Sequence, residues 1–295
     1  MKNKAIFYIF IIIVLCSAFL ININKSYECF SNLPKYNNTN LIAITYDTDT
    51  HNNEVNNLTK MFQKNNYKYK VLGNGDVWNG WYGRSQAYIT YMNTLDNNKY
   101  VILCDGRDVV VNCSSHIFLQ TAFKLREKNG DKIIVGTEKG CCTGDLNNIY
   151  RANNIPNNIT NFQELYMEQQ RQNSAKYNNY KFDYINFGLM FGKVDEFKNL
   201  FNVLNIQPDQ DDQALLHKHY YENPDLLYLD HNQELFSNSS YNYNRFDKPG
   251  DNLCYYEWDN EFKAFKNMIS NTIPCIIHVP AKNWECYNSL IDKLL

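Results

Sequence analysis

A short apolar run followed by two acids, between residues 99 and 112, most constrains the fold of this chain. Residues 100–104 are apolar throughout and form a run of the length expected for a buried strand. Asp105 and Asp108 follow directly, and a second apolar run starts at Val109. Because open α/β folds bind ligands at the carboxyl ends of their strands, the sequence predicts both aspartates at a ligand-binding edge.

Two carboxylates at such an edge repel each other unless a positive group lies between them. A hard divalent cation, Mn²⁺ or Mg²⁺, takes oxygen ligands and can also hold the phosphates of a substrate. The alternative is a solvated turn with two surface acids, because a DxxD spacing often arises by chance. Other parts of the chain have to distinguish these two interpretations.

Strand-like runs alternate with segments of helical periodicity along the chain. The strand-like runs are residues 41–46, 67–72, 100–104, 132–135, 184–191, 226–229 and 275–279. The helical segments are residues 54–64, 86–95, 115–127, 194–204 and 211–221. This alternation predicts an α/β fold with a mainly parallel central sheet and crossover helices. No internal repeat is visible, so residues 41–295 are expected to form one domain.

The amino-terminal segment differs from the rest. Lys2 and Lys4 precede a run from residue 5 to residue 21 that is apolar except for Ser17. The run is longer than the usual core of a signal peptide and lies at the lower limit for a membrane-spanning helix. Lysines before the run favour a cytosolic amino terminus. We expect a signal anchor at residues 1–23, a polar stem at 24–40, and a single-pass type II protein.

This topology would place residues 41–295 in the ER or Golgi lumen, or outside the cell if the anchor is cleaved. Eight of the nine cysteines follow the apolar run, an even number in a compartment that permits disulfides, and no zinc spacing occurs. Six glycosylation sequons are present, but an asparagine-rich chain generates them by chance. The net charge of −2 gives no basic surplus for nucleic acid.

Candidate ligand contacts lie at the first strand and in the loop that follows the second. Thr45 and Tyr46 end the first strand and should share the sheet edge of Asp105. Trp78 lies in the glycine-rich loop 73–83, where it can approach a ligand and stack on a planar base. The alternative for Trp78 is an aromatic side chain packed over the rim of the domain.

Further candidates lie in the second half of the chain. Asn186 is embedded in an apolar strand, where its amide must find partners, either structural ones or a substrate. Asp211 and Asp212 belong to an acidic helix start, and helix capping accounts for one of these acids. His278 ends the last strand and can complete the coordination of a metal, although a lone histidine is more often simply hydrogen-bonded. Lys282 can meet a diphosphate as a point charge.

The order of these motifs resembles the glycosyltransferase domain of procollagen lysine hydroxylases and of the related collagen glycosyltransferases, a GT-A-type, Rossmann-like domain. The resemblance covers residues 41 to about 285 and includes DGRD at 105–108, GTE at 136–138, INFG at 185–188, DDQ at 211–213, LDHNQELF at 229–236 and IIH at 276–278. It implies Mn²⁺, with Mg²⁺ as the alternative, bound by Asp105, Asp108 and His278. It also implies that Thr45 and Trp78 contact the uridine, and places Asn186, Asp211 and Asp212 near the sugar and its acceptor. Beside these residues we expect Tyr46, Arg107 and Lys282 to contact the UDP-sugar.

Three positions depart from the family pattern. Arg107 stands where the family usually has an aromatic residue, although a guanidinium can still stack on a base or pair with phosphate. Ala87 stands at the expected lysine, and HVPAK at 278–282 replaces the usual HxNG. These departures concern the donor and the acceptor more than the metal.

The resemblance implies a transferase that moves glucose or galactose from a UDP-sugar to a protein acceptor, hydroxylysine or galactosyl-hydroxylysine of collagen-like chains. Asp211 or Asp212 would orient the acceptor hydroxyl or act as a base. Two alternatives remain open. A lumenal carbohydrate- or protein-binding module without turnover is favoured by Ala87 and HVPAK. A metal-dependent phosphohydrolase would need a denser metal set or a nucleophile, and neither is evident.

Overall fold

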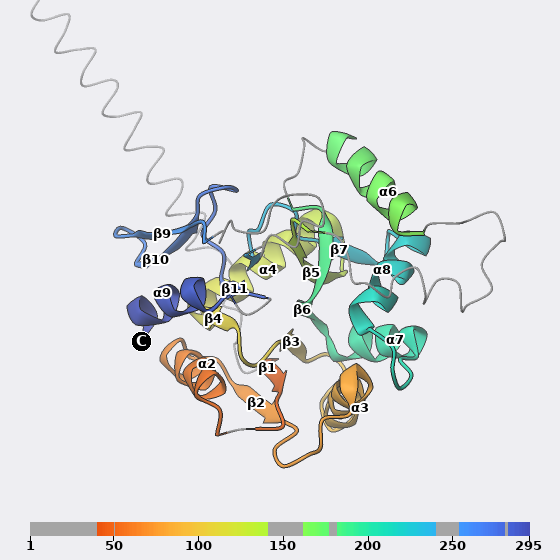
Figure 1. Cartoon of the computed structure of the whole chain (residues 1–295), viewed down its shortest axis with the longest axis horizontal. Helices are drawn as coiled ribbons and strands as arrows, with labels where there is room; N and C mark the ends of the chain where they lie inside the picture. Colours follow the sequence, from red (N-terminus) through yellow and green to blue (C-terminus); the bar gives the residue numbers. More distant parts are fainter. Residues whose placement is uncertain (1–39, 50, 141–161, 177–181, 240–253, 281–282) are drawn as a thin grey trace, which may run out of the picture. The chain divides into compact units, whose positions relative to one another are not determined.

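A six-stranded sheet lies at the centre of the chain (Figure 1). The computed structural model describes residues 40–49, 51–140, 162–176, 182–239, 254–280 and 283–295. The strands follow the order β2-β1-β3-β6-β5-β7. Their bounds are β1 Leu41–Tyr46, β2 Tyr69–Leu72, β3 Tyr100–Cys104, β5 Ile133–Glu138, β6 Tyr184–Lys193 and β7 Leu227–Leu229. Together with the helices between them, these strands confirm the predicted α/β class.

One strand runs against the others. β1, β2 and β3 pair in parallel, and so do β5 and β7, whereas β6 is antiparallel to both β3 and β5. Five strands therefore share a direction, which agrees with the predicted mainly parallel sheet, and the reversed β6 makes the sheet mixed. β6 is buried along nearly its whole length. An apolar run of this kind identifies a central strand, but it does not encode the direction of that strand.

Helices cover both faces of this sheet (Figure 1). Their bounds are α2 Asn53–Lys64, α3 Gly80–Met92, α4 Ser115–Asn129, α6 Phe162–Lys176, α7 Val194–Leu204, α8 Asp212–Glu222 and α9 Trp284–Leu294. Helices α3, α6, α7 and α8 share one apolar core with Val101 and Leu103 of β3. On the other face, Phe118 of α4 packs against Phe191 of β6. Alternate residues of a strand face opposite sides, so the apolar strands are buried between two helical layers.

The start of α3 differs from the sequence-based expectation. The pattern predicts a loop through residue 83 and a helix from about residue 86, whereas the helix begins at Gly80. Gly80 has a φ of +61°, a conformation that glycine adopts without strain. Glycines at positions 80 and 83 are typical of loops, so the sequence pattern does not reveal the first turn of α3. That turn carries Trp81 and Arg84.

A second, three-stranded sheet has the order β4-β11-β8, and β9 pairs with β10 in a separate hairpin. The bounds are β4 Val109–Val111, β8 Phe236–Asn238, β9 Tyr256–Asp259, β10 Ala264–Asn267 and β11 Ile276–His278. Disulfides join Cys113 to Cys275 and Cys254 to Cys286, and Cys104 is the free cysteine among the described residues. The first disulfide connects the segment after β4 to the residue before β11. The second connects the segment before β9 to α9.

The predicted anchor at residues 1–23 lies outside the described residues, as does the stem except for residue 40. Within the described ranges, every helix is too short or too polar to cross a bilayer. The anchor, the type II topology and the lumenal location therefore stay predictions. Two of the predicted sequons begin at buried residues, because Asn112 is 5% exposed and Asn238 is 0% exposed.

Candidate functional site

Asp105, Asp108 and His278 come together where the two sheets meet. Asp105 follows β3, and its backbone N–H donates to the carbonyl of Gly188 on β6 at 3.0 Å. Antiparallel pairing of β4 with β11 sets His278 opposite Val109, the residue after Asp108. One ligand atom from each of the three side chains lies within 4.8 Å of the other two. The structure thus assembles the three residues that the sequence proposes as metal ligands.

The cluster has the chemistry of a cation site. His278 Nε2 lies 3.4 Å from Asp105 Oδ2 and 3.3 Å from Asp108 Oδ1. The atom is buried and has no hydrogen-bond partner. Burial lowers the pKa of His278, but the charges of Asp108 and Asp105 outweigh it and raise the pKa to about 8. Two carboxylate oxygens and one imidazole nitrogen fit a divalent cation such as Mn²⁺.

Gly188 makes this approach possible. A Cβ at this position would lie 2.5 Å from His278 Cε1 and 2.7 Å from Asp105 Oδ2. Both distances are shorter than any ordinary contact, and both neighbours belong to the cluster. Position 188 therefore has to be glycine for Asp105 and His278 to lie this close. The INFG segment supplies it directly after Phe187.

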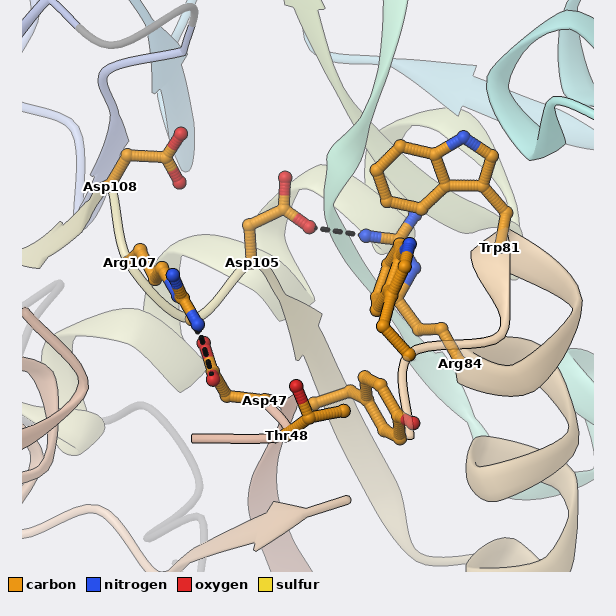
Figure 2. Close-up of a pocket in the computed structure, with 10 residues that line it drawn as sticks. Asp47, Thr48, Trp81, Arg84, Asp105, Arg107 and Asp108 are labelled. Atoms are coloured by element: carbon orange, nitrogen blue, oxygen red, sulfur yellow. Dashed lines mark hydrogen bonds and ion pairs between the residues drawn. The ribbon is translucent and has the colours of Figure 1, made fainter. Parts of the chain in front are cut away.

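Arg84 of α3 is a site residue that the sequence analysis missed. Its Nη1 donates to Asp105 Oδ1 at 2.5 Å (Figure 2). Its Nη2 donates to Asp212 Oδ2 at 2.5 Å. The guanidinium lies over the rings of Trp81, at 4.4 Å, and Phe187, at 5.1 Å. Arg84 is 5% exposed. The arginine thus holds one oxygen of Asp105 while the other oxygen faces His278.

Ala87 lies on the same helix, half-buried against the core. Arg84 lies one turn earlier on this helix, where its guanidinium pairs with Asp105 and Asp212. The sequence does contain a signal for Arg84, because this arginine shares the buried face of the helix with apolar residues. Arg84, Tyr88 and Met92 are spaced four residues apart and are all buried.

A cavity of about 540 Å³ opens beside the aspartates. It is lined by Tyr46, Asp47, Thr48, Trp78, Trp81, Arg84, Asp105, Gly106, Arg107 and Asp108. Figure 2 shows Asp108 and Arg107 on one side and Trp81 on the other. Trp78 is 50% exposed, and its ring centroid is 6.0 Å from that of Tyr46 and 5.2 Å from that of Trp81. The cavity therefore has one charged side and one aromatic side.

Arg107 is held in place by Asp47, a second residue that the sequence analysis missed. Its Nε donates to Asp47 Oδ2 at 2.6 Å and its Nη2 donates to Asp47 Oδ1 at 2.9 Å. The Asp47 side chain is 6% exposed, whereas that of Arg107 is 47% exposed. This bidentate pair fixes the guanidinium at the wall of the cavity and leaves part of it accessible.

The other predicted residues lie at different depths. Thr45 is 1% exposed and lies beneath Gly106 without lining the cavity. Asp211 caps α8 by accepting from the backbone N–H of Ala214 at 2.8 Å. Asp212 is 2% exposed, and burial raises its pKa to about 6 although Arg84 opposes the shift. Lys282 lies outside the described residues.

Asn186 lies beside the cluster. Its Oδ1 accepts from the backbone N–H of Gly188 at 2.8 Å and lies 3.0 Å from His278 Nδ1. Its Nδ2 donates to Glu138 Oε2 at 3.2 Å, and Gln213 donates to Glu138 Oε1 at 3.1 Å. Burial raises the pKa of Glu138 to about 7, against the opposing effects of His278 and the two amides.

Comparisons with known proteins give distant similarities. No family model matches the chain. An uncharacterised protein of Acanthamoeba polyphaga mimivirus is 22% identical over an alignment of 209 residues, which covers 68% of this chain. The chain spans 40% of the length of that relative.

Among solved structures, a glycosyltransferase involved in the glycosylation of the major capsid of PBCV-1 is 10% identical, with a TM-score of 0.43 over 85% of this chain and 98% of that one. Mouse xyloside xylosyltransferase 1 is 11% identical, with a TM-score of 0.40 over 82% of this chain and 98% of that one. A 4-diphosphocytidyl-2C-methyl-D-erythritol synthase from Anaerococcus prevotii is 12% identical, with a TM-score of 0.34 over 64% of this chain and 87% of that one. At these values, the comparisons assign no family to the chain.

Proposed function

We propose that this chain is a metal-dependent glycosyltransferase of GT-A type that transfers glucose or galactose from a UDP-sugar. The observation that carries the proposal is the cavity itself. Its charged side holds Asp105 and Asp108, which adjoin His278, and its aromatic side holds Tyr46, Trp78 and Trp81. A nucleoside diphosphate has the same division, because its base is flat and apolar and its phosphates require cations.

The residues at the charged side of the cavity have different proposed roles. A divalent cation bound by Asp105, Asp108 and His278 would act as a Lewis acid for the negative charge that builds on the departing diphosphate. Arg84 holds Asp105 through Oδ1 and leaves Oδ2 directed to the cluster. Lys282, two residues past the described strand segment, is expected from the sequence to assist at the phosphates.

The two acids of α8 receive different roles. Asp212 is buried and bonded to Arg84. We therefore assign it to holding Arg84 rather than to proton transfer. Asp211 is half-buried and caps the helix. The expected acceptor is a hydroxyl group of a protein, in the form of hydroxylysine or galactosyl-hydroxylysine of collagen-like chains. That expectation, like the lumenal anchor, comes from the sequence resemblance.

The binding-module alternative still rests on Ala87 and on HVPAK at 278–282. The phosphohydrolase alternative gains no support from the residues that the structure describes. Among the described residues, Asp105, Asp108 and His278 are the single cluster of this kind. A hydrolase that uses two metal ions needs a second set of ligands.

The direct test is UDP release from UDP-glucose and UDP-galactose in the presence of Mn²⁺. Asp105→Ala and Asp108→Ala should each lower the rate by at least about a hundredfold, because each removes a ligand of the charge-stabilising cation. The matched control is Asp225→Ala, which removes an exposed acid distant in sequence from the site. Full activity in either site variant would exclude the metal site. Hydrolysis of p-nitrophenyl phosphate without UDP release would identify a hydrolase, and sugar binding without turnover would identify a binding module.

A further inference from the structure

The ring nitrogen of His278 that points away from the cluster faces two side-chain amides. Nδ1 lies 3.0 Å from Asn186 Oδ1 and 2.8 Å from Asn238 Oδ1. All three side chains are buried, with His278 2% exposed, Asn186 5% exposed and Asn238 0% exposed. Contacts of this kind determine which ring nitrogen carries the proton, provided that each amide has a defined orientation.

Other hydrogen bonds define both orientations. The oxygen of Asn186 also accepts from the Gly188 N–H, and its nitrogen donates to Glu138. The nitrogen of Asn238 donates to the carbonyl of Thr137 at 2.9 Å. A flipped amide would place nitrogen against the Gly188 N–H in the first case, and oxygen against the Thr137 carbonyl in the second. Each amide therefore presents its oxygen to Nδ1.

The segment before β8 holds Asn238 in position. Gln233 Oε1 accepts from the backbone N–H of Asn238 at 3.0 Å, and Gln233 Nε2 donates to the Thr137 carbonyl at 2.8 Å. The buried carboxylate of Asp230 accepts from the backbone N–H groups of Glu234, Leu235 and Phe236. The LDHNQELF segment of the sequence thus builds a rigid support behind the histidine.

Two acceptors at Nδ1 require a hydrogen on that nitrogen. In a neutral ring the lone pair then lies on Nε2, which faces Asp105 Oδ2 and Asp108 Oδ1. We propose that Asn186 and Asn238 are positioning residues that fix the Nδ1–H tautomer of His278 and direct Nε2 to the cation. The inference rests on the proposed metal site and adds the residues that orient its nitrogen ligand. Outer partners of a ligating histidine commonly tune affinity in this way.

The test measures the affinity of the full chain for Mn²⁺ from the electron paramagnetic resonance signal of the free ion, without any donor or acceptor. Asn238→Leu removes the acceptor and keeps the branched shape of the side chain. It should weaken Mn²⁺ binding by about tenfold to a hundredfold. Asn238→Asp keeps an oxygen acceptor at Nδ1 and should restore part of the affinity, because its second oxygen then meets the Thr137 carbonyl.

The matched control is Asn112→Leu. Asn112 is 5% exposed, and its side chain bonds the backbone of Phe265 and Pro274 rather than the histidine. Its loss should lower the melting temperature but leave Mn²⁺ affinity unchanged. If Asn238→Leu shows no cooperative melting, Asn186→Leu makes the same test from the other amide.

The outcomes separate the two proposals. Wild-type protein that binds no Mn²⁺ contradicts the proposed function. Wild-type binding with equal affinity in a folded Asn238→Leu or Asn186→Leu variant overturns the positioning role alone. Equal weakening in Asn238→Leu and Asn112→Leu would also overturn it, because the effect would then follow from general destabilisation.

Discussion

Arg84 and Arg126 are both buried, and each bridges two acidic side chains, but Arg84 lines the cavity beside Asp105 and Asp108 and Arg126 does not. Arg84 joins Asp105 to Asp212. Arg126 joins Glu196 to Asp131, and its Nη1 also donates to the Lys132 carbonyl at 2.6 Å. The two arginines are 5% and 3% exposed. Burial and pairing alone therefore do not distinguish a site from a structural ion pair.

The two ion pairs differ in how the carboxylate oxygens of Glu196 and Asp105 are used. Both oxygens of Glu196 are used within the fold, since Oε1 and Oε2 bond Arg126 and Oε2 also accepts from the backbone N–H of Lys193. Asp105 instead gives one oxygen to Arg84 and leaves the other beside a histidine nitrogen that has no hydrogen bond. A site is recognised by the atoms that the fold leaves available, rather than by the strength of the ion pair.

Replacing each arginine by methionine gives the largest expected effect. Arg84→Met leaves Asp212 buried without a cation, so it should lower the free energy of unfolding by about 3–5 kcal/mol. Arg126→Met should cost less, because the Asp131 side chain is 72% exposed. Only Arg84→Met should also weaken Mn²⁺ binding, by about tenfold, since Asp105 loses its support. Urea denaturation and a Mn²⁺ titration of both variants test this. Equal Mn²⁺ affinity in the two variants would remove the distinction.

His217 extends the comparison to a buried base without a carboxylate partner. Burial lowers its pKa from 6.5 to about 4, although a hydrogen bond with the Ile185 carbonyl opposes the shift. The folded state thus holds the ring neutral where the unfolded chain binds a proton. Stability that is complete above about pH 6.5 should decline as the pH falls toward 4.

In His217→Gln, the free energy of unfolding should fall by up to about 3 kcal/mol less than in the wild type over this pH range. The measurement is the free energy of unfolding in urea across the acidic range, for wild type and variant. His116→Gln, which replaces an exposed histidine of α4, controls for the substitution. Parallel pH profiles for wild type and His217→Gln would show that the ring is charged in the fold.

Two glycines test the packing of the site at the smallest scale. Gly188→Ala would place a Cβ 2.5 Å from His278 Cε1. It should weaken Mn²⁺ binding by about tenfold to a hundredfold, because a displaced ligand loses its geometry. Gly140→Ala is the matched control, since a Cβ there has nothing within 4 Å. Calorimetric titration measures the Mn²⁺ affinity of both variants. Unchanged affinity in Gly188→Ala would mean that the cluster can accommodate a Cβ at position 188.

The sequence predicted the members of the candidate metal cluster but not their supports. The end of a buried strand predicted the place of Asp105 and Asp108, and the family resemblance added His278 to them. Arg84 was not predicted as a site residue, because Gly80 and Gly83 made the first turn of α3 resemble a loop. Asp47 follows the first strand without a pattern that marks it, and its role became visible in its bidentate pair with Arg107.

The sequence by itself determined the α/β class, because apolar runs and helical periodicity are local properties of the chain. It also predicted which side chains are candidate metal ligands, because oxygen and imidazole chemistry does not depend on the fold. Tertiary structure decided the reversed direction of β6 and the register that sets His278 beside Asp108. It also decided which oxygen of Asp105 stays available. These features depend on residues far apart in the sequence, and no local pattern of residues records such pairings.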